Sequence, residues 1–416
     1  MNKREFLQGL GGFTLAALVG ERAWARWSEM PATQLAKEDE FWRALRGQYQ
    51  PPTDIVQLEN GYYSMMAQPV LEAYIGHLRA LNVETSRYMR TKAEDDNLRA
   101  RKALARVAGC SHEELVVTRN TTEALDLVIA GHEWKPGDEA VMAETDYGAM
   151  LDMFEQEARR HGLVNKRVLL PLDPRSDDEL VELYASAITP RTRLLMVCHV
   201  ANITGQVLPV AKICAMARSK GVATLVDGAH AFAQLEFRLD ELGCDYYGTS
   251  LHKWLGCPLG AGFLYVRRER IPGLWPLLAP STKPDGDITR LNHTGTQPAA
   301  TLLAIHDALA FHEQIGVARK EARLRHLQSY WTSRVRGLPK LRLNTPSDPA
   351  RTCGLANVGI EGLAPADLAR QLLERFRIYT VAIDRANVQG VRVTPHLYTT
   401  EADLDQLIAA LRTLAS

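Results

Sequence analysis

The sequence carries no excess of charge of either sign. Lysine and arginine together number 49, and so do aspartate and glutamate. A chain that binds nucleic acid or an anionic membrane surface through its charge would show a basic excess. We therefore expect neither partner, and a small-molecule substrate instead. The 416 residues, 46% of them apolar, suffice for two or three domains with a large core.

Motifs for metals and nucleotides are also missing. The six cysteines show no CxxC or other metal-ligand spacing, and no Walker or GxGxxG fingerprint occurs. We therefore expect no metal site. Cys198 falls in an expected core strand and Cys214 in an expected amphipathic helix, so buried thiols are expected. An oxidising compartment would permit disulfides, but the sequence predicts no particular bridge.

Residues 1–25 differ from the rest of the chain. A charged head precedes a short apolar run and an AxA-like site that ends at Ala25, a pattern typical of an export signal and not of a membrane anchor. The run KREFL resembles a twin-arginine signal in which Lys3 replaces the first arginine. It implies transport to the bacterial periplasm by the machinery that exports folded proteins. A cytoplasmic enzyme with an amphipathic N-terminal helix is the alternative.

The most informative stretch runs from residue 223 to residue 253. A short apolar run predicts a buried strand that ends at Asp227, and a second one leads into Ser250, His252 and Lys253. Ligands of open α/β sheets collect at the carboxyl ends of strands. A buried lysine loses its charge easily and can attack a carbonyl. This arrangement suits pyridoxal 5'-phosphate, with Lys253 as the Schiff-base lysine and Asp227 at the pyridine nitrogen.

Two motifs carry a family resemblance. VDGAHA at 226–231, followed by TSLHKW at 249–254, resembles the class V aminotransferases among the fold-type I pyridoxal phosphate enzymes. The likeness is strongest to the isopenicillin N epimerase-like branch and extends from about Asn60 to the C-terminus. It implies a large domain with a mostly parallel, seven-stranded sheet covered by helices, and a smaller α+β domain.

The order of predicted elements agrees with that fold. Strand and helix patterns alternate from residue 114 to 267, as in βαβ units. We expect a signal at 1–25, an N-terminal arm at 26–60, a large cofactor-binding domain at 61–315 and a small domain at 316–416. A linker helix at 318–336 opens the small domain, and strands are expected at 355–360, 379–383 and 388–393.

Two segments before residue 150 are candidates for holding the cofactor. Thr121 and Thr122 open a helix after a predicted strand, where free N–H groups and the helix dipole favour an anion. They resemble the family's phosphate-binding TRxTTEA segment, although a plain helix cap would give the same pattern. Tyr147 follows another strand and matches the ring that relatives stack on the cofactor. An ordinary surface tyrosine is the alternative.

Four further residues join Asp227 and Lys253 through the resemblance. Asn202 matches a residue that hydrogen-bonds the cofactor's phenolic oxygen, and His230 matches a glutamine or histidine that reaches the same oxygen. Ser250 and His252 precede the lysine and are also expected to contact the cofactor. A core histidine with no cofactor contact is the alternative for His230.

The remaining candidates concern the substrate and a partner subunit. Asn60 and Gly61 resemble a loop at the active-site mouth, although a plain turn is equally compatible. Arg392 resembles the arginine that grips the substrate carboxylate, a contact for which the planar guanidinium is suited. Gly295 and Thr296 resemble a segment that relatives insert into the partner's phosphate site, which implies a homodimer with shared active sites. A helix cap at Thr296 is the alternative.

The reaction is left open between several outcomes. Lys253 can act as a base at the α-carbon, and the chain is expected to catalyse epimerisation or transamination of an amino acid-like substrate. Tailoring of a peptide or siderophore, such as the glutamate side chain of pyoverdine, is the runner-up. Desulfuration is disfavoured because residues 384–391 contain no cysteine. A cofactor-binding protein without catalysis is the alternative of another class.

Overall fold

The computed structural model of the protein describes residues 21–279 and 283–416. Most of the predicted export signal, residues 1–20, therefore lies outside the described residues. Its expected cleavage position, Ala25, lies in helix α3 (Glu21–Ser28). Trp27 of this helix is buried in the main core. Export therefore stays a prediction.

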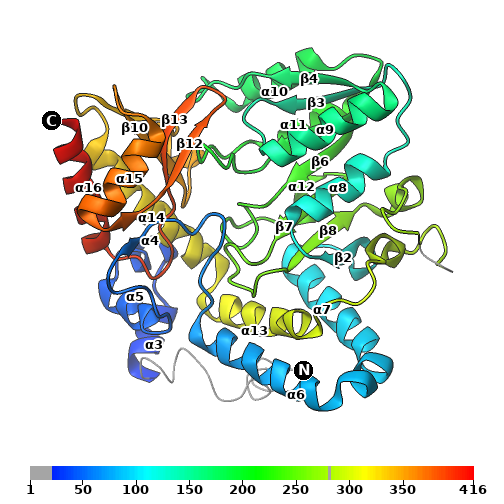
Figure 1. Cartoon of the computed structure of the whole chain (residues 1–416), viewed down its shortest axis with the longest axis horizontal. Helices are drawn as coiled ribbons and strands as arrows, with labels where there is room; N and C mark the ends of the chain where they lie inside the picture. Colours follow the sequence, from blue (N-terminus) through cyan, green and yellow to red (C-terminus); the bar gives the residue numbers. More distant parts are fainter. Residues whose placement is uncertain (1–20, 280–282) are drawn as a thin grey trace.

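A seven-stranded sheet forms the large domain (Figure 1). The strand order is β2-β8-β7-β6-β5-β3-β4, and β8 runs antiparallel to both of its neighbours while the other pairings are parallel. This confirms the predicted, mostly parallel sheet. The strands are β2 (Leu115–Thr118), β3 (Glu139–Ala143), β4 (Val164–Val168), β5 (Thr192–Cys198), β6 (Ala223–Asp227), β7 (Tyr246–Ser250) and β8 (Gly262–Val266).

Helices cover both faces of this sheet because side chains alternate along each strand. In β6, for example, Val226 packs into one core and Leu225 into the other. Helices α8 (Thr121–Gly131) and α9 (Gly148–His161) pack on the Leu225 face. The opposite face is covered by α7 (Ala93–Ala108), α10 (Asp177–Ala187), α11 (Val210–Ser219) and α13 (Ala299–Ile315).

The small domain has its own sheet and core. Its antiparallel order is β12-β13-β10-β9, with strands β9 (Leu341–Leu343), β10 (Ala356–Ile360), β12 (Val381–Arg385) and β13 (Val388–Val393). Its helices are α14 (Val317–Val335), α15 (Pro365–Phe376) and α16 (Glu401–Ala415). The long helix α14 leads into this domain, close to the linker range expected from the sequence.

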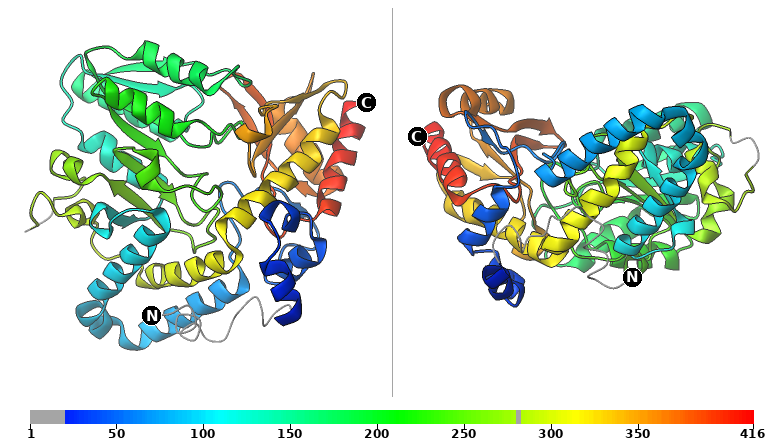
Figure 2. Two further views of the ribbon diagram at one scale, coloured as in Figure 1. Left: turned by 180° about the vertical axis from the view of Figure 1, so that it is seen from behind. Right: turned by 90° about the horizontal axis from the view of Figure 1, so that it is seen from below.

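The N-terminal arm is attached to the small domain, which the sequence did not reveal. After α4 (Ala32–Leu35) and α5 (Asp39–Arg46), the short strand β1 (Val56–Gln57) pairs in parallel with β11 (Ile378–Tyr379). Helix α6 (Gln68–Thr91) then returns to the large domain and lies beside α13, as Figure 2 shows from below. The residues between β1 and α6 therefore pass between the two domains.

The remaining elements are short. They are helix α12 (Leu239–Leu242) and the 3₁₀ turns η1 (His112–Glu114), η2 (Arg268–Gly273), η3 (Ile288–Asn292) and η4 (Pro349–Arg351). Within the described ranges, no helix combines the length and apolar character needed to cross a membrane.

Candidate active site

A cavity of about 260 Å³ lies at the carboxyl ends of β5, β6 and β7. It brings together nine residues that the sequence singled out as cofactor contacts, from segments up to 132 positions apart. They are Thr121, Thr122, Tyr147, Asn202, Asp227, His230, Ser250, His252 and Lys253. Parallel strands end at the same edge of a sheet, so residues that follow them converge there.

Asp227 ends strand β6 at the floor of the cavity and is 3% exposed. Burial raises the pKa of its carboxyl, while the Ala229 N–H, which donates to Oδ1 at 2.9 Å, and the nearby Lys253 ammonium act in the opposite direction. The following residue must be glycine. A Cβ at Gly228 would lie 1.9 Å from the Tyr247 ring, so the chain turns tightly around that ring.

Lys253 lines the same cavity as Asp227. The pKa of its ammonium is lowered from 10.5 to about 8, mainly by burial. The negative charge of Asp227 raises this pKa, and the positive charge of Arg392 lowers it further. Its Nζ lies 3.4 Å from His230 Nε2. A lysine with this pKa is partly uncharged near neutral pH, so its amine is available as a nucleophile and as a base.

His230 is held as a neutral ring with a defined tautomer. Burial lowers its pKa well below the ordinary value, and the charges of Lys253 and Arg392 lower it further. Trp254 Nε1 donates to His230 Nδ1 at 3.4 Å. Because an indole nitrogen only donates, Nδ1 is the acceptor and the single proton lies on Nε2, toward Lys253.

One end of the cavity is built to receive an anion. Helix α8 begins at Thr121, and Asn120 is the residue that caps it, accepting from Glu123 N at 2.9 Å. Thr121 N donates to Ser250 Oγ at 2.9 Å, and the two hydroxyl oxygens lie 2.7 Å apart. The positive end of this eleven-residue helix therefore lies at the cavity, beside the hydroxyl groups of Thr121 and of Ser250 from β7.

Aromatic rings form the walls. Tyr147 precedes α9, and Tyr63 stacks on His252 with 6.0 Å between ring centroids. Sequence reasoning missed seven lining residues: Tyr62, Tyr63, Arg119, Asn120, Ala229, Leu259 and Gly260. Arg119 and Asn120 directly precede the predicted pair of threonines and could have been included with them. The two tyrosines carry no local signal beyond their place after Asn60 and Gly61.

The lining residues fit pyridoxal phosphate. A lysine and a buried carboxylate share the cavity with a helix start that favours an anion. Asn202 is buried and its Oδ1 has no hydrogen-bond partner within the structure, so its amide is left for a bound group. Among the described residues, no cluster of histidine, cysteine, aspartate and glutamate could hold a metal ion.

The predicted substrate-binding residues lie behind the cavity wall. Arg392 is completely buried, and its guanidinium pairs with Glu59. Asn60 donates from its backbone N to Thr394 Oγ1 at 2.7 Å, and Gly61 N donates to the same oxygen at 3.0 Å. Asn60, Gly61 and Arg392 do not line the cavity, and their roles toward a substrate stay predictions.

Gly295 and Thr296 are exposed and lie outside the Lys253 cavity. Gly295 lines a separate pocket of about 640 Å³, together with Arg101, His112 and Lys283. The predicted contact of this segment with the phosphate site of another subunit stays a prediction.

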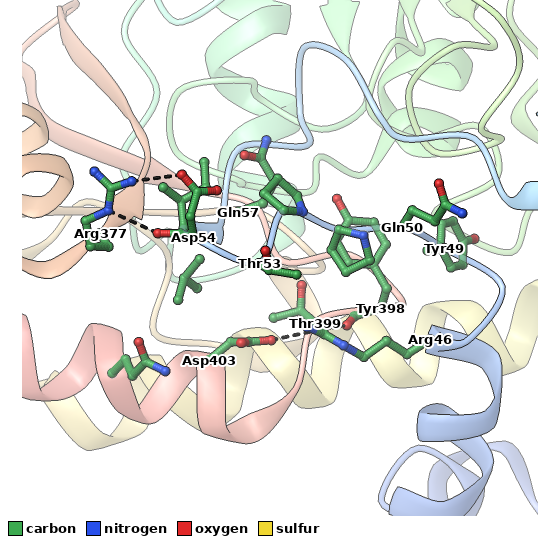
Figure 3. A pocket seen from close by; sticks show the side chains of 15 residues that line it. Arg46, Tyr49, Gln50, Thr53, Asp54, Gln57, Arg377, Tyr398, Thr399 and Asp403 are labelled. Atoms are coloured by element: carbon green, nitrogen blue, oxygen red, sulfur yellow. Dashed lines mark hydrogen bonds and ion pairs between the residues drawn. The ribbon is translucent and has the colours of Figure 1, made fainter.

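A further pocket of about 630 Å³ lies between the N-terminal arm and the small domain (Figure 3). Two ion pairs line it: Arg46 Nη1 to Asp403 Oδ2 at 3.1 Å and Arg377 Nη2 to Asp54 Oδ2 at 2.9 Å. It shares no residue with the Lys253 cavity and contains no lysine. Its arginines are already neutralised by carboxylates, so we do not assign catalysis to it.

Comparison with known proteins places the site in a family context. The aminotransferase class V model matches residues 60–407. Isopenicillin N epimerase of Streptomyces clavuligerus is 30% identical over 390 residues, which cover 90% of this chain and 98% of that protein. A probable cysteine desulfurase of Pseudomonas aeruginosa is 30% identical over 383 residues, covering 86% and 93%.

Solved structures share the fold. A C-DES mutant with glycine covalently linked to its pyridoxal phosphate cofactor superposes with a TM-score of 0.80. The two chains are 23% identical, and the match covers 88% of this chain and 98% of the other. This likeness concerns the architecture, and the reaction has to be argued from the residues.

Proposed function

The chain belongs to the class V aminotransferase family and its cofactor is pyridoxal phosphate, and we propose that it acts at the α-carbon or amino group of an amino acid-like substrate, as an epimerase- or aminotransferase-type enzyme. The observation that carries this proposal is that Lys253 and the buried carboxyl group of Asp227 line one cavity. The kinship with an isopenicillin N epimerase supports chemistry at an amino-bearing carbon.

The residues divide the work between binding and proton transfer. Lys253 would hold the cofactor, Asp227 its ring nitrogen, and Thr121 with Thr122 its phosphate. When bound, pyridoxal phosphate withdraws electrons from the substrate carbon. Once the substrate amine has replaced Lys253 on the cofactor, the released Nζ would be available to remove the α-proton, and its lowered pKa favours the uncharged amine that this role needs. His230 Nε2 lies 3.4 Å from Lys253 Nζ, so its N–H would be able to donate to a group bound beside that lysine.

Two other activities fit the cavity less well. Desulfuration needs a nucleophilic thiol, and no cysteine is among the residues that line the cavity. The thiol of Cys198 is buried. Burial raises its pKa well above the ordinary value and the charge of Asp227 raises it further, so this thiol is a poor nucleophile. A purely binding protein has no need of a lysine with a lowered pKa beside a buried carboxylate.

We further propose a homodimer in the periplasm. The exposed position of Gly295 and Thr296 supports a contact with a second copy of the chain, because this segment is free to reach another molecule. The periplasmic location is supported by the charged head and apolar run of residues 1–25.

Absorbance spectroscopy of the purified protein with added amino acids tests the proposed function. Conversion of the cofactor to its amine form, reversed by an oxo acid, would indicate transamination. Exchange of the α-proton in heavy water with inverted product and unchanged cofactor would indicate epimerisation. The Lys253→Ala variant should lose the covalent cofactor link and all turnover. Multiple turnovers by this variant would refute the role of Lys253.

A further inference from the structure

The guanidinium of Arg392 is already bound to a carboxylate of its own chain. Nε donates to Glu59 Oε2 at 3.1 Å and Nη2 donates to Glu59 Oε1 at 2.7 Å, so the pair is bidentate. Nη1 donates to the backbone oxygen of Asn202 at 3.1 Å. The exposed fraction of Arg392 is 0% and that of Glu59 is 5%. The positive charge is therefore neutralised inside the protein before any ligand enters.

The faces of the guanidinium are covered as well. The Tyr62 ring centroid lies 4.0 Å from Arg392 Cζ, and Tyr62 itself lines the cavity. A Cβ at Gly61 would lie 3.2 Å from Cζ and from Nη2, so the backbone of the 59–62 segment packs directly on the guanidinium. A molecule in the cavity meets Tyr62 and not Arg392.

Glu59 is fixed in its turn. Its Oε1 also accepts a hydrogen bond from Tyr62 N at 2.8 Å. The preceding and following residues are bonded to the strand end after Arg392: Thr394 N donates to Leu58 O at 2.8 Å, and Asn60 Nδ2 donates to Thr394 O at 2.8 Å. Rotating Glu59 away would break both contacts of its Oε1 and leave a buried carboxylate without its partner, which is strongly destabilising.

We propose that Glu59 determines the substrate class: by neutralising Arg392 it disfavours a free carboxylate next to the reacting amine and favours an amine whose neighbouring carboxyl group is amidated or absent. This inference rests on the proposed function and narrows it. A substrate carboxylate would have to displace Glu59 or share one guanidinium with it, and two carboxylates on one buried cation repel each other. A neutral amide in the same place meets neither penalty.

A pair of matched compounds tests the proposal on the enzyme with pyridoxal phosphate bound. L-Glutamate carries a charged α-carboxylate where its α-amide carries a neutral group of similar size, and both are titrated against the absorbance of the bound cofactor. The Glu59→Gln variant should raise the affinity for the free acid relative to the amide by about tenfold or more, the value of a charge-assisted hydrogen bond pair. The quantity compared is the ratio of the affinity for L-glutamate to the affinity for its α-amide. Comparing this ratio between variants cancels the difference in amine basicity between the two compounds.

Two further variants serve as controls. Asp54→Asn removes the exposed ion pair with Arg377, which joins the same arm to the same domain but lines the other pocket. It should keep the wild-type ratio. The Glu59→Gln/Arg392→Gln double variant replaces the ion pair by a neutral pair of similar shape. It should also return to the wild-type ratio, because the gain in the single variant depends on the freed Arg392.

Each outcome has a defined meaning. A double variant that loses affinity for the free acid by tenfold or more, relative to the wild type, would show that Arg392 already binds the substrate carboxylate and would overturn the proposal. A Glu59→Gln variant with an unchanged or lowered ratio would overturn it as well. The double variant remains informative if the single variant fails to fold. If neither compound perturbs the cofactor spectrum of the wild type, the proposed function itself fails, and the inference with it.

Discussion

The lowered pKa of Lys253 leads to a quantitative prediction about cofactor loading. Burial brings the pKa to about 8, from an ordinary value of 10.5. At pH 7 about a tenth of Lys253 is then uncharged, against about one part in three thousand for a lysine with the ordinary pKa. Because only the uncharged amine attacks the aldehyde, the protein should react with pyridoxal phosphate about 300-fold faster than the basicity of an exposed lysine allows.

The assay is covalent loading of the cofactor-free protein over a range of pH. The rate, followed by the visible absorbance of the lysine-bound cofactor, should rise with pH and level off above about pH 8, where Lys253 is mostly uncharged. Free lysine in the same buffers provides the reference for the ionisations of pyridoxal phosphate itself. The Lys253→Ala variant gives the background from other amines.

A substitution at Asp227 tests the cause of the shift. The negative charge of Asp227 raises the pKa of Lys253, against the larger effect of burial. The Asp227→Asn variant should therefore move the midpoint of the loading profile to lower pH. A wild-type rate that still climbs through pH 10 would refute the reasoning, since Lys253 would then titrate as a solvated lysine.

Two further predictions concern cofactor binding and stability. Ser250→Ala removes the acceptor of the Thr121 N–H and should weaken cofactor affinity by about 1 kcal/mol, or about fivefold, in an absorbance titration; an unchanged affinity would show that Ser250 does not shape the anion site. Burial raises the pKa of Glu139, but hydrogen bonds from Thr189, Lys166 and Arg191 outweigh it and lower the pKa to about 2. This stabilisation is complete above the ordinary pKa of 4.5 and disappears as the pH falls toward 2. Glu139→Gln should cost about 1–3 kcal/mol at neutral pH and flatten the acid limb of the stability curve in denaturant unfolding; a variant with a wild-type acid limb would contradict it.

The sequence predicted the parts of the site that follow from local pattern. The apolar runs that end at Asp227 and Ser250 identify strands, and parallel strands end at one edge of a sheet. Residues that follow separate strands, such as Asn202 and Lys253, must therefore meet. The motif around Thr121 is likewise a strand followed by a helix start, and the structure adds that Asn120 is the residue that caps this helix.

Only the tertiary structure decided what Arg392 binds. Glu59 lies 333 positions away. It reaches Arg392 because β1 and β11, two strands of two residues each, pair Val56 with Ile378 and so join the two segments. Strands this short carry no recognisable period, and a carboxylate in the sequence does not indicate which arginine it will meet. The sequence by itself determined the family and the cofactor and predicted Lys253 as the reactive lysine, because these depend on contiguous motifs. Whether the positive charge of Arg392 is available to a substrate depends on its long-range contact with Glu59, which the packing of the two domains creates.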